Sequence, residues 1–262
     1  MSSPSELARI LDAGGLRLEL DGPVATVTLD RPETRNAQTP ATWDALRMIG
    51  ESLAADVRVV VVRGAGDTFS SGLDRRMLEP GAAGSPVLDL LHLDDQAMAD
   101  RIATWQEGFT WLRRPGIVSV AAVRGAAVGA GFQLALACDL RVLGDDARLS
   151  MREPMLGLVP DLTGTKALVD CVGYSRALEI CATTRWVPAT EARDIGLATA
   201  VVPAGDLDAA VTDLVAGLLA PVHAAVRETK ALLLGAGRRD LEEQRLAERQ
   251  AQVRRFRALS EG

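Results

Sequence analysis

Short apolar runs alternate with helix-length segments along most of the chain, and this alternation constrains the fold more than any other feature. Residues 24–29 alternate apolar and polar side chains, which predicts a half-buried strand. Two mostly apolar runs predict buried strands at 57–62 and 117–123, and a further short strand is predicted at 140–143. Helices are predicted after Thr39-Pro40, over 97–112 and up to Ala137. This order predicts an α/β fold with largely parallel strands.

The pattern changes near residue 203, because only helical segments follow. We predict helices at 206–220, 222–234 and 241–259. The sequence therefore divides into a core at 1–202 and a helical region at 203–262. The second part is too small to hold a hydrophobic core of its own, so we expect it to pack on the first part and on neighbouring subunits. The connection 80–86 (PGAAGSP) is predicted to be the most mobile.

Charge and composition exclude several classes of protein. The chain has 29 Lys+Arg against 35 Asp+Glu, which argues against a nucleic-acid partner and a polybasic membrane binder. The most apolar stretch, 117–137, is interrupted by Arg124 and Gln133, and no signal-peptide pattern precedes it, so we expect a cytoplasmic protein without membrane contact. The three cysteines lack a C-x-x-C spacing and the two histidines lie far apart, so no metal site is expected.

Two glycine-rich turns each follow an apolar strand, at 69–74 and at 124–131. The second resembles the opening of a dinucleotide fingerprint, but its sixth position is Leu134 instead of glycine, and no P-loop lysine or G-x-S-x-G elbow is present. Turns of this kind leave backbone N–H groups unpaired. Two such donors converging on one oxygen would stabilise an oxyanion. The alternative is that both are ordinary tight turns.

Two carboxylates, Glu153 and Asp161, lie in an otherwise apolar segment at 150–165. Prolines and glycines between them make a continuous helix unfavourable, so a loop would have to bring the two acids together. A carboxylate in apolar surroundings has a raised pKa and can move protons. The alternative is that Glu153 pairs with Arg152 at the surface and that Asp161 caps the following helix.

The chain resembles the crotonase (enoyl-CoA hydratase/isomerase) superfamily in an ordered set of segments: 30–37 (DRPETRNA), the two glycine turns, 150–165 and 190–198 (TEARDIGLA). The resemblance implies a spiral core of repeated ββα units with a C-terminal helical region. It also implies homotrimers or dimers of trimers, and an acyl-CoA thioester as substrate. No cofactor is implied beyond the coenzyme A that the substrate itself carries.

The same resemblance assigns site residues by position. The backbone N–H groups of Leu73 and Ala130 match the two donors that hold the enolate oxygen, and Ala130 stands where the family usually has glycine. Other residues are expected to line the site (Gly72, Gly129, Met77), to bind the coenzyme A phosphates (Arg35, Arg75, Arg76) or to meet the acyl chain (Met77, Leu78, Leu90, Leu91 and the helix at 105–112).

The acids depart from the hydratase pattern, which has two glutamates. The later glutamate matches Glu153, whereas the earlier one falls on Gln133, which neither takes nor gives a proton at neutral pH. Isomerases of the family work with the later glutamate, and dienoyl-CoA isomerases have an aspartate where this chain has Asp161. We therefore expect double-bond isomerisation, with Gln133 bonded to a water or to the thioester. The alternatives are a hydratase with Glu153 as its single acid and a non-catalytic acyl-CoA-binding protein.

Overall fold

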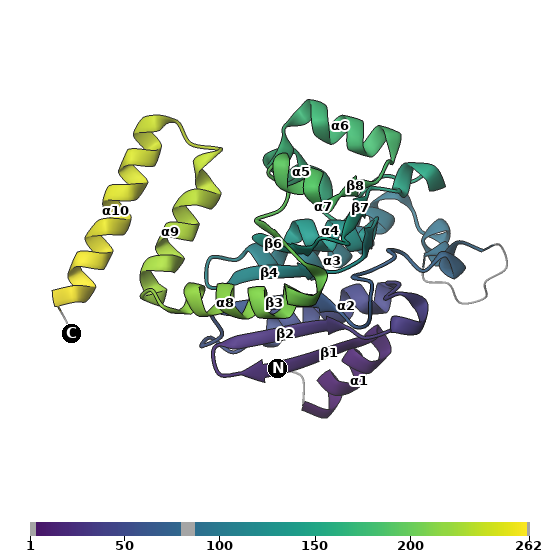
Figure 1. Cartoon of the computed structure of the whole chain (residues 1–262), viewed down its shortest axis with the longest axis horizontal. Coiled ribbons are helices and arrows are strands. Elements are labelled where there is room, and N and C mark those ends of the chain that lie inside the picture. Colours follow the sequence, from purple (N-terminus) through teal and green to yellow (C-terminus); the bar gives the residue numbers. More distant parts are fainter. Residues whose placement is uncertain (1–3, 80–86, 261–262) are drawn as a thin grey trace.

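The computed structural model describes residues 4–79 and 87–260, so the connection predicted to be mobile lies outside the described residues. A six-stranded sheet with the order β1-β2-β3-β4-β6-β9 forms the centre of the molecule (Figure 1). The β1–β2 pair is antiparallel and every later pair in this sheet is parallel. The strands are β1 (Leu16–Asp21), β2 (Val24–Leu29), β3 (Val59–Gly64), β4 (Val118–Val123), β6 (Leu140–Gly144) and β9 (Ala200–Val202).

A second, three-stranded sheet has the order β5-β7-β8, with bounds Ala126–Val128, Arg148–Ser150 and Val187–Pro188. β5 follows β4 and β7 follows β6 after short turns, so consecutive strands pass from the large sheet to the small one. A helix follows β5, and another follows β7 after a loop. The chain thus repeats a strand–strand–helix unit, which confirms the predicted spiral α/β fold.

The helices of the described residues lie around the two sheets, except for the last two, which extend away from them (Figure 1). They are α1 (Pro4–Gly14), α2 (Pro40–Ser52), α3 (Asp95–Thr110), α4 (Ala130–Ala137), α5 (Gly164–Val172), α6 (Tyr174–Thr183), α7 (Ala189–Asp194), α8 (Leu207–Leu219), α9 (His223–Ala236) and α10 (Leu241–Ser260). Proline at the first position of α2 follows Thr39, which forms a capping box with Thr42, as the Thr-Pro pair predicts.

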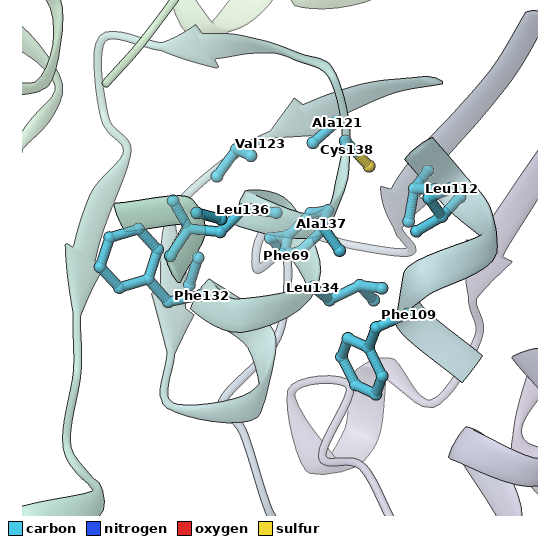
Figure 2. Packing of buried hydrophobic residues seen from close by; sticks show 14 of the residues in the cluster. Phe69, Phe109, Leu112, Ala121, Val123, Phe132, Leu134, Leu136, Ala137 and Cys138 are labelled. Carbon is cyan, nitrogen blue, oxygen red and sulfur yellow. The ribbon is translucent and has the colours of Figure 1, made fainter. Parts of the chain in front are cut away.

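Helix α4 lies in the main core, where all eight of its residues are buried. Its apolar side chains pack with Phe69 from the first glycine turn and with Phe109 from α3 (Figure 2). The absence of a polar face on α4 follows from this position, since a helix that is hydrophobic all round must be buried all round. The start of α4 is therefore held by packing on every side.

Helix α8 covers the other face of the large sheet. Leu207 and Val211 form a second cluster with side chains of β3, β4 and β6. The strands β3 and β4 are consequently buried on both faces, which explains why their sequences are continuous apolar runs instead of alternating ones. No single helix of the described residues is long and apolar enough to cross a membrane; 204–219 and α9 pass that test only as a pair bent by 101°.

Helices α9 and α10 form an antiparallel arm that extends to one side of the sheets (Figure 1). The arm is tied to the core through Lys230 of α9, whose Nζ donates to the Ile117 carbonyl and to Asp139 Oδ2, both at 2.7 Å. Asp139 Oδ2 also accepts from the backbone N–H and the hydroxyl of Ser119. One buried ionic junction thus joins the arm to β4 and to the segment after α4.

Candidate active site

The two glycine turns lie side by side. The backbone of Ser70 donates to the Ala126 carbonyl at 3.0 Å and accepts from the N–H of Val128 at 3.0 Å, so the first turn runs parallel to β5. Gly72 has φ +85°, and a Cβ there would lie 2.5 Å from the Val128 carbonyl oxygen and 3.5 Å from the Ala130 nitrogen. Only glycine allows the two backbones to approach this closely.

Two N–H groups remain available at this junction. The Leu73 and Ala130 N–H groups have no hydrogen-bond acceptor among the described residues, whereas the Gly72 N–H donates to Ser70 Oγ and the Gly129 N–H donates to the Ser150 carbonyl. Ala130 begins α4, where the helix dipole adds partial positive charge. The structure therefore places the two predicted donors next to each other, at the end of a buried helix.

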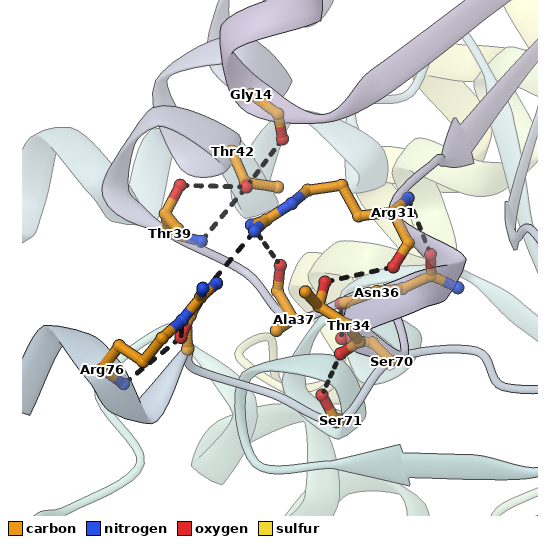
Figure 3. Close-up of polar contacts among 11 residues, drawn as sticks. Gly14, Arg31, Thr34, Asn36, Ala37, Thr39, Thr42, Ser70, Ser71 and Arg76 are labelled. Carbon is orange, nitrogen blue, oxygen red and sulfur yellow. Dashed lines mark hydrogen bonds and ion pairs between the residues drawn. The ribbon is translucent and has the colours of Figure 1, made fainter.

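Asn36 holds the first turn in place (Figure 3). Its side-chain Oδ1 accepts from the Arg31 N–H at 3.0 Å, and its Nδ2 donates to the carbonyls of Ala65 and Thr68. Its own carbonyl accepts from the Ser70 hydroxyl at 2.7 Å. Asn36 is buried and has φ 54°, a left-handed conformation that asparagine tolerates better than most residues. This network joins the segment 31–36 to the strand end that precedes the turn.

Glu153 lies on the other side of the second turn, at the start of a 3-10 helix, Glu153–Leu156, which follows β7. It is 9% exposed; Oε1 accepts from Gln133 Nε2 at 2.6 Å, while the buried Oε2 has no hydrogen-bond partner among the described residues. A Cβ on Gly129 would lie 3.2 Å from Glu153 Oε1, so the carboxylate is close to the backbone next to Ala130. Burial raises the pKa of Glu153.

Gln133, one turn into α4, is bonded within the protein. Its Oε1 accepts from the backbone N–H groups of Leu162 at 2.9 Å and Gly164 at 3.2 Å, and its Nε2 donates to Glu153. Nε2 carries a second N–H besides the one given to Glu153, so the expected bond to a water or to the thioester stays a prediction. The spacing of 20 residues between Gln133 and Glu153 carries no signal of this contact, because two separate turns of the spiral bring them together.

Asp161 lies near Glu153, and the pKa of each carboxyl group is raised by burial; the negative charge of Asp161 raises the pKa of Glu153 further. The helix-cap alternative is wrong, since α5 begins after Thr163 without a side-chain cap bond. The surface-pair alternative is wrong too, because the Arg152 guanidinium lies over the Trp186 ring, 4.6 Å from its centroid. The loop does bring the two acids together.

A cationic cavity of about 520 Å³ opens beside the first turn. Its lining includes Leu73 and Val128, and it contains the three predicted coenzyme A-binding arginines, Arg35, Arg75 and Arg76. Three further lining residues, Arg148, Arg152 and Trp186, were not predicted; Arg148 lies on β7, and the other two lie next to strands of the second sheet. Arg148 and Arg152 each lie 4.6 Å from the ring centroid of Trp186, and only the pairing of β7 with β8 shows that these distant segments meet.

The residues expected to meet the acyl chain are spread more widely. Met77 and Leu78 lie in a 3-10 helix directly after the first turn, and Leu90 packs against the main core. Leu91, in contrast, is 72% exposed. Trp105 is 2% exposed and packs edge-on against Trp43, with 5.1 Å between ring centroids, so it belongs to the core.

Comparisons with known proteins decide the family. The family model described as enoyl-CoA hydratase/isomerase matches residues 19–262. The chain belongs to this family. It is therefore a crotonase-type enzyme, in agreement with the resemblance and with the spiral fold.

Relatives of several kinds cover most of this chain. It is 31% identical to the peroxisomal Delta(3,5)-Delta(2,4)-dienoyl-CoA isomerase of Arabidopsis thaliana over 84% of this chain and 80% of that protein. A Thermobifida fusca YX protein solved in complex with acetoacetyl-CoA is 53% identical, with a TM-score of 0.92 over 96% of this chain and 98% of that one. An enoyl-CoA hydratase from Polaromonas sp. JS666 is 29% identical, with a TM-score of 0.77 over 91% and 90%.

Proposed function

We propose that this enzyme isomerises the double bond of an unsaturated acyl-CoA thioester through an enolate. The observation that carries the proposal is the environment of Glu153. Within the described part of the chain, this buried carboxylate has one oxygen without a partner, lies beside two backbone donors without acceptors, and faces an amide instead of a second carboxylate. One proton carrier next to an oxyanion site is what a positional shift of a double bond requires.

The Leu73 and Ala130 N–H groups would hold the thioester oxygen. Removing the α-proton of a thioester places negative charge on that oxygen, and preorganised N–H donors stabilise it where water is excluded. Each such donor is worth about 10²–10³ in rate. Both positions need only their main chain, so leucine and alanine serve there, and the Ala130 donor also has the start of α4 behind it.

Glu153 Oε2 would carry the proton. It removes the proton from C2 of a 3-enoyl-CoA, and the electron pair of that C–H bond is delocalised onto the thioester oxygen as a dienolate. The same carboxyl group then returns the proton to C4, so that the double bond moves to C2–C3 and no other reactant is consumed. Burial raises the pKa of Glu153 above its ordinary value, which makes its carboxylate a stronger base.

Hydration is disfavoured by Gln133. Water addition to a 2-enoyl-CoA needs one group to activate the water and another to deliver the α-proton, and Gln133 can do neither at neutral pH. Its amide is already bonded to Glu153 and to two backbone N–H groups. A hydratase with Glu153 as its single acid is the alternative within the family.

Asp161 supports a substrate with two double bonds as a second candidate. Its carboxyl group is close enough to affect the pKa of Glu153, and its own pKa is raised by burial. A second proton carrier would allow a proton to be removed at one end of a diene and another to be delivered at the far end. Among the relatives, the Arabidopsis dienoyl-CoA isomerase supports this candidate by name.

The coenzyme A portion would occupy the cationic cavity. A planar guanidinium suits phosphate recognition, and the described lining contains five arginines against Glu33 and Asp74. Asp74 is itself paired with Arg76 at 2.6 Å, which lowers the pKa of its carboxyl group and leaves the lining positive. We therefore add Arg148 and Arg152 to the predicted set Arg35, Arg75 and Arg76.

The test uses 3-enoyl-CoA, 2-enoyl-CoA and 3,5-dienoyl-CoA thioesters with the purified protein in D₂O. We expect the double bond of the 3-enoyl substrate to shift, with deuterium entering at C2 or C4 and no 3-hydroxyacyl-CoA formed. Rapid hydration of the 2-enoyl substrate without any positional shift of the others would contradict the proposal. An absence of deuterium exchange in every thioester, with binding retained, would show a non-catalytic acyl-CoA-binding protein instead.

We also propose that the chain forms a homotrimer or a dimer of trimers. Large apolar side chains remain exposed on the arm, where Leu233 is 70% and Phe256 63% exposed, and on the loop beside Glu153, where Val159 is 72% exposed. Covering such side chains with another subunit removes apolar surface from water and lowers the free energy of the assembly. Sedimentation velocity measures the oligomeric state directly, and a monomer at micromolar concentration would contradict this proposal.

A further inference from the structure

We propose that Gln133 is a positioning residue: the backbone of residues 162–164 locks its amide, and the amide holds Oε1 of Glu153 so that Oε2 is the oxygen that transfers protons. This inference rests on the proposed function, because it concerns the same carboxylate. It assigns a separate task to each oxygen of Glu153, to the amide of Gln133 and to the start of α5.

The orientation of the Gln133 amide is determined by its partners. Its Oε1 accepts two backbone N–H groups, from Leu162 and Gly164. If the amide were flipped, its NH₂ group would face these two donors, and its oxygen would face the carboxylate of Glu153. Both contacts would be repulsive. The amide therefore presents an N–H to Glu153, and the 2.6 Å contact is a donor–acceptor bond to an ionised carboxylate.

The slot around Gln133 is closed on the side of α5. A Cβ on Gly164 would lie 2.6 Å from Gln133 Cγ and 3.0 Å from its Oε1. Both residues are buried, and Gly164 is the first residue of α5. A glycine at this place lets the helix start come close enough for its N–H to reach the amide oxygen. The position of Gln133 is thus set by the Leu162–Gly164 backbone.

The groups that face Glu153 leave Gln133 as its principal stabilising side chain. Asp161 repels the ionised form, and Cys181 of α6 is close enough for Glu153 to raise the pKa of its thiol. The adjacent Arg152 lies over Trp186 and donates to Ser150 Oγ instead of to the carboxylate. The Gln133 N–H favours the ionised form and so opposes the effect of burial on the pKa of Glu153.

The consequence is a defined division between the two carboxylate oxygens. The Gln133 N–H occupies a lone pair of Oε1. This hydrogen bond restricts rotation of the Glu153 carboxyl group. Oε2 is buried, has no partner among the described residues and is the oxygen left for the substrate. If the amide is lost, the anion is less stabilised, so the pKa of Glu153 rises and a smaller fraction of the carboxyl group is ionised at a given pH. The two oxygens also become equivalent, so the base is less well oriented.

The experiment measures the pH dependence of kcat/KM for α-proton exchange of a 3-enoyl-CoA in D₂O. Gln133→Met removes the donor and keeps the length of the side chain. We expect about a 10- to 100-fold loss at neutral pH, the size of a hydrogen bond to a charged group, and a rise in the midpoint of the acid limb. Gly164→Ala, which leaves the amide in the sequence but pushes it away, should move the midpoint in the same direction by a smaller amount.

A third variant separates donation from packing. Gln133→Glu has nearly the same shape, but a carboxylate oxygen would then face Glu153 Oε1 where an N–H now does, and two carboxylates so close must share a proton. The two backbone N–H groups favour the charge on residue 133, so the proton stays on Glu153. We expect the midpoint to rise further than in Gln133→Met.

The control is Gly217→Ala in α8, where a Cβ meets nothing within 4 Å, and its profile should match the wild type. A uniform loss of rate with an unchanged midpoint in Gln133→Met, or in Gly164→Ala if Gln133→Met does not fold, would overturn the inference. The proposed function fails in a different way: the wild type itself would exchange no proton, or Glu153→Gln would exchange protons as fast as the wild type.

Discussion

The core around α4 and the arm formed by α9 and α10 are both largely helical, yet they use apolar side chains in opposite ways. Every residue of α4 is buried, and its neighbours in the main cluster are nearly all below 5% exposed. In α10, all of which the structure describes, only Ala251 is buried, while Phe256 and Leu259 are 63% and 73% exposed. The core buries its apolar side chains within the chain, whereas the arm leaves large apolar side chains exposed to solvent.

This contrast separates two functions within one chain. The backbone donors and Glu153 are positioned by residues that are packed on all sides, so the site geometry is a property of the single chain. The arm is joined to the core by α8 and by the Lys230 junction. Its exposed apolar residues have no contact that buries them within the described residues. Substitutions in the core should therefore change stability and activity together, and substitutions of the exposed apolar residues of the arm should change assembly alone.

The largest effect on stability is expected at the junction between the two regions. Lys230→Met leaves the carboxylate of Asp139 without its cation at a place where both side chains are at most 16% exposed. Breaking a buried ion pair from one side costs about 3–5 kcal/mol of the free energy of unfolding. Urea denaturation measures this loss, and hydrogen exchange should show faster opening of α9. The double variant Lys230→Met/Asp139→Asn should recover part of the loss; if it recovers nothing, the ionic junction is not what ties the arm to the core.

A matched pair of glycine substitutions compares the two regions directly. Gly72→Ala in the first turn puts a methyl group 2.5 Å from the Val128 carbonyl oxygen at φ +85°, and we expect a loss of about 2–4 kcal/mol together with most of the activity. Gly237→Ala at the end of α9 meets nothing within 4 Å and should change neither. Thermal unfolding and the exchange assay measure both variants. Equal effects on stability would remove the distinction between the core and the arm.

Glu153→Gln should make the protein more stable although it abolishes proton exchange. Because burial raises the pKa of Glu153 in the folded state, the stability that its protonated form contributes is present below the ordinary value of 4.5 and is lost as pH rises through the folded pKa. A glutamine does not titrate. We therefore expect its Tm to exceed that of the wild type by a few degrees at pH 8 and the gap to close at pH 4. A gap that widens towards acid pH would contradict the assignment of a raised pKa.

The smallest effect on stability is expected in the arm. Phe256→Glu changes an exposed side chain, so the free energy of unfolding of one chain should change by less than about 0.5 kcal/mol. The oligomer should dissociate at a higher protein concentration than the wild type, which sedimentation velocity measures. Arg257→Glu on the same helix is the control, because it introduces a glutamate without removing an apolar side chain, and we expect it to leave assembly unchanged. An unchanged assembly in Phe256→Glu would place the subunit contacts elsewhere.

Much of the fold was predictable because buried parallel strands leave a continuous apolar signal. The prediction of 117–123 differs by one residue from β4 (Val118–Val123), and that of 57–62 lies two residues before β3 (Val59–Gly64). The structure adds α1, β1 and the short strands β5, β7 and β8, which were not predicted from the sequence. Strands of two or three residues are too short to show a period, and they form only because the small sheet pairs segments that are distant in sequence.

Site residues were predictable where the backbone conformation requires one residue type. They were not predictable where a side chain is bonded to residues from distant segments of the chain. Gly72 and Gly129 marked the two donor turns because a left-handed backbone selects glycine. Gln133 was identified by position, but its bonds to Glu153, Leu162 and Gly164 could not be read from spacing, because they join three segments of the spiral. Arg148 and Trp186 were not predicted as cavity residues for the same reason, because they meet only through the pairing of β7 with β8.

The sequence by itself determined the α/β class, the helical end of the chain and the residue types that chemistry requires: glycines at the turns, a glutamate in an apolar segment and an amide at position 133. Those are local properties, set by backbone conformation and by the composition of short segments. Only the tertiary structure decided which oxygen of Glu153 is free and which way the Gln133 amide points. Hydrogen-bond direction depends on partners brought together by folding, and no single segment contains both ends of such a bond.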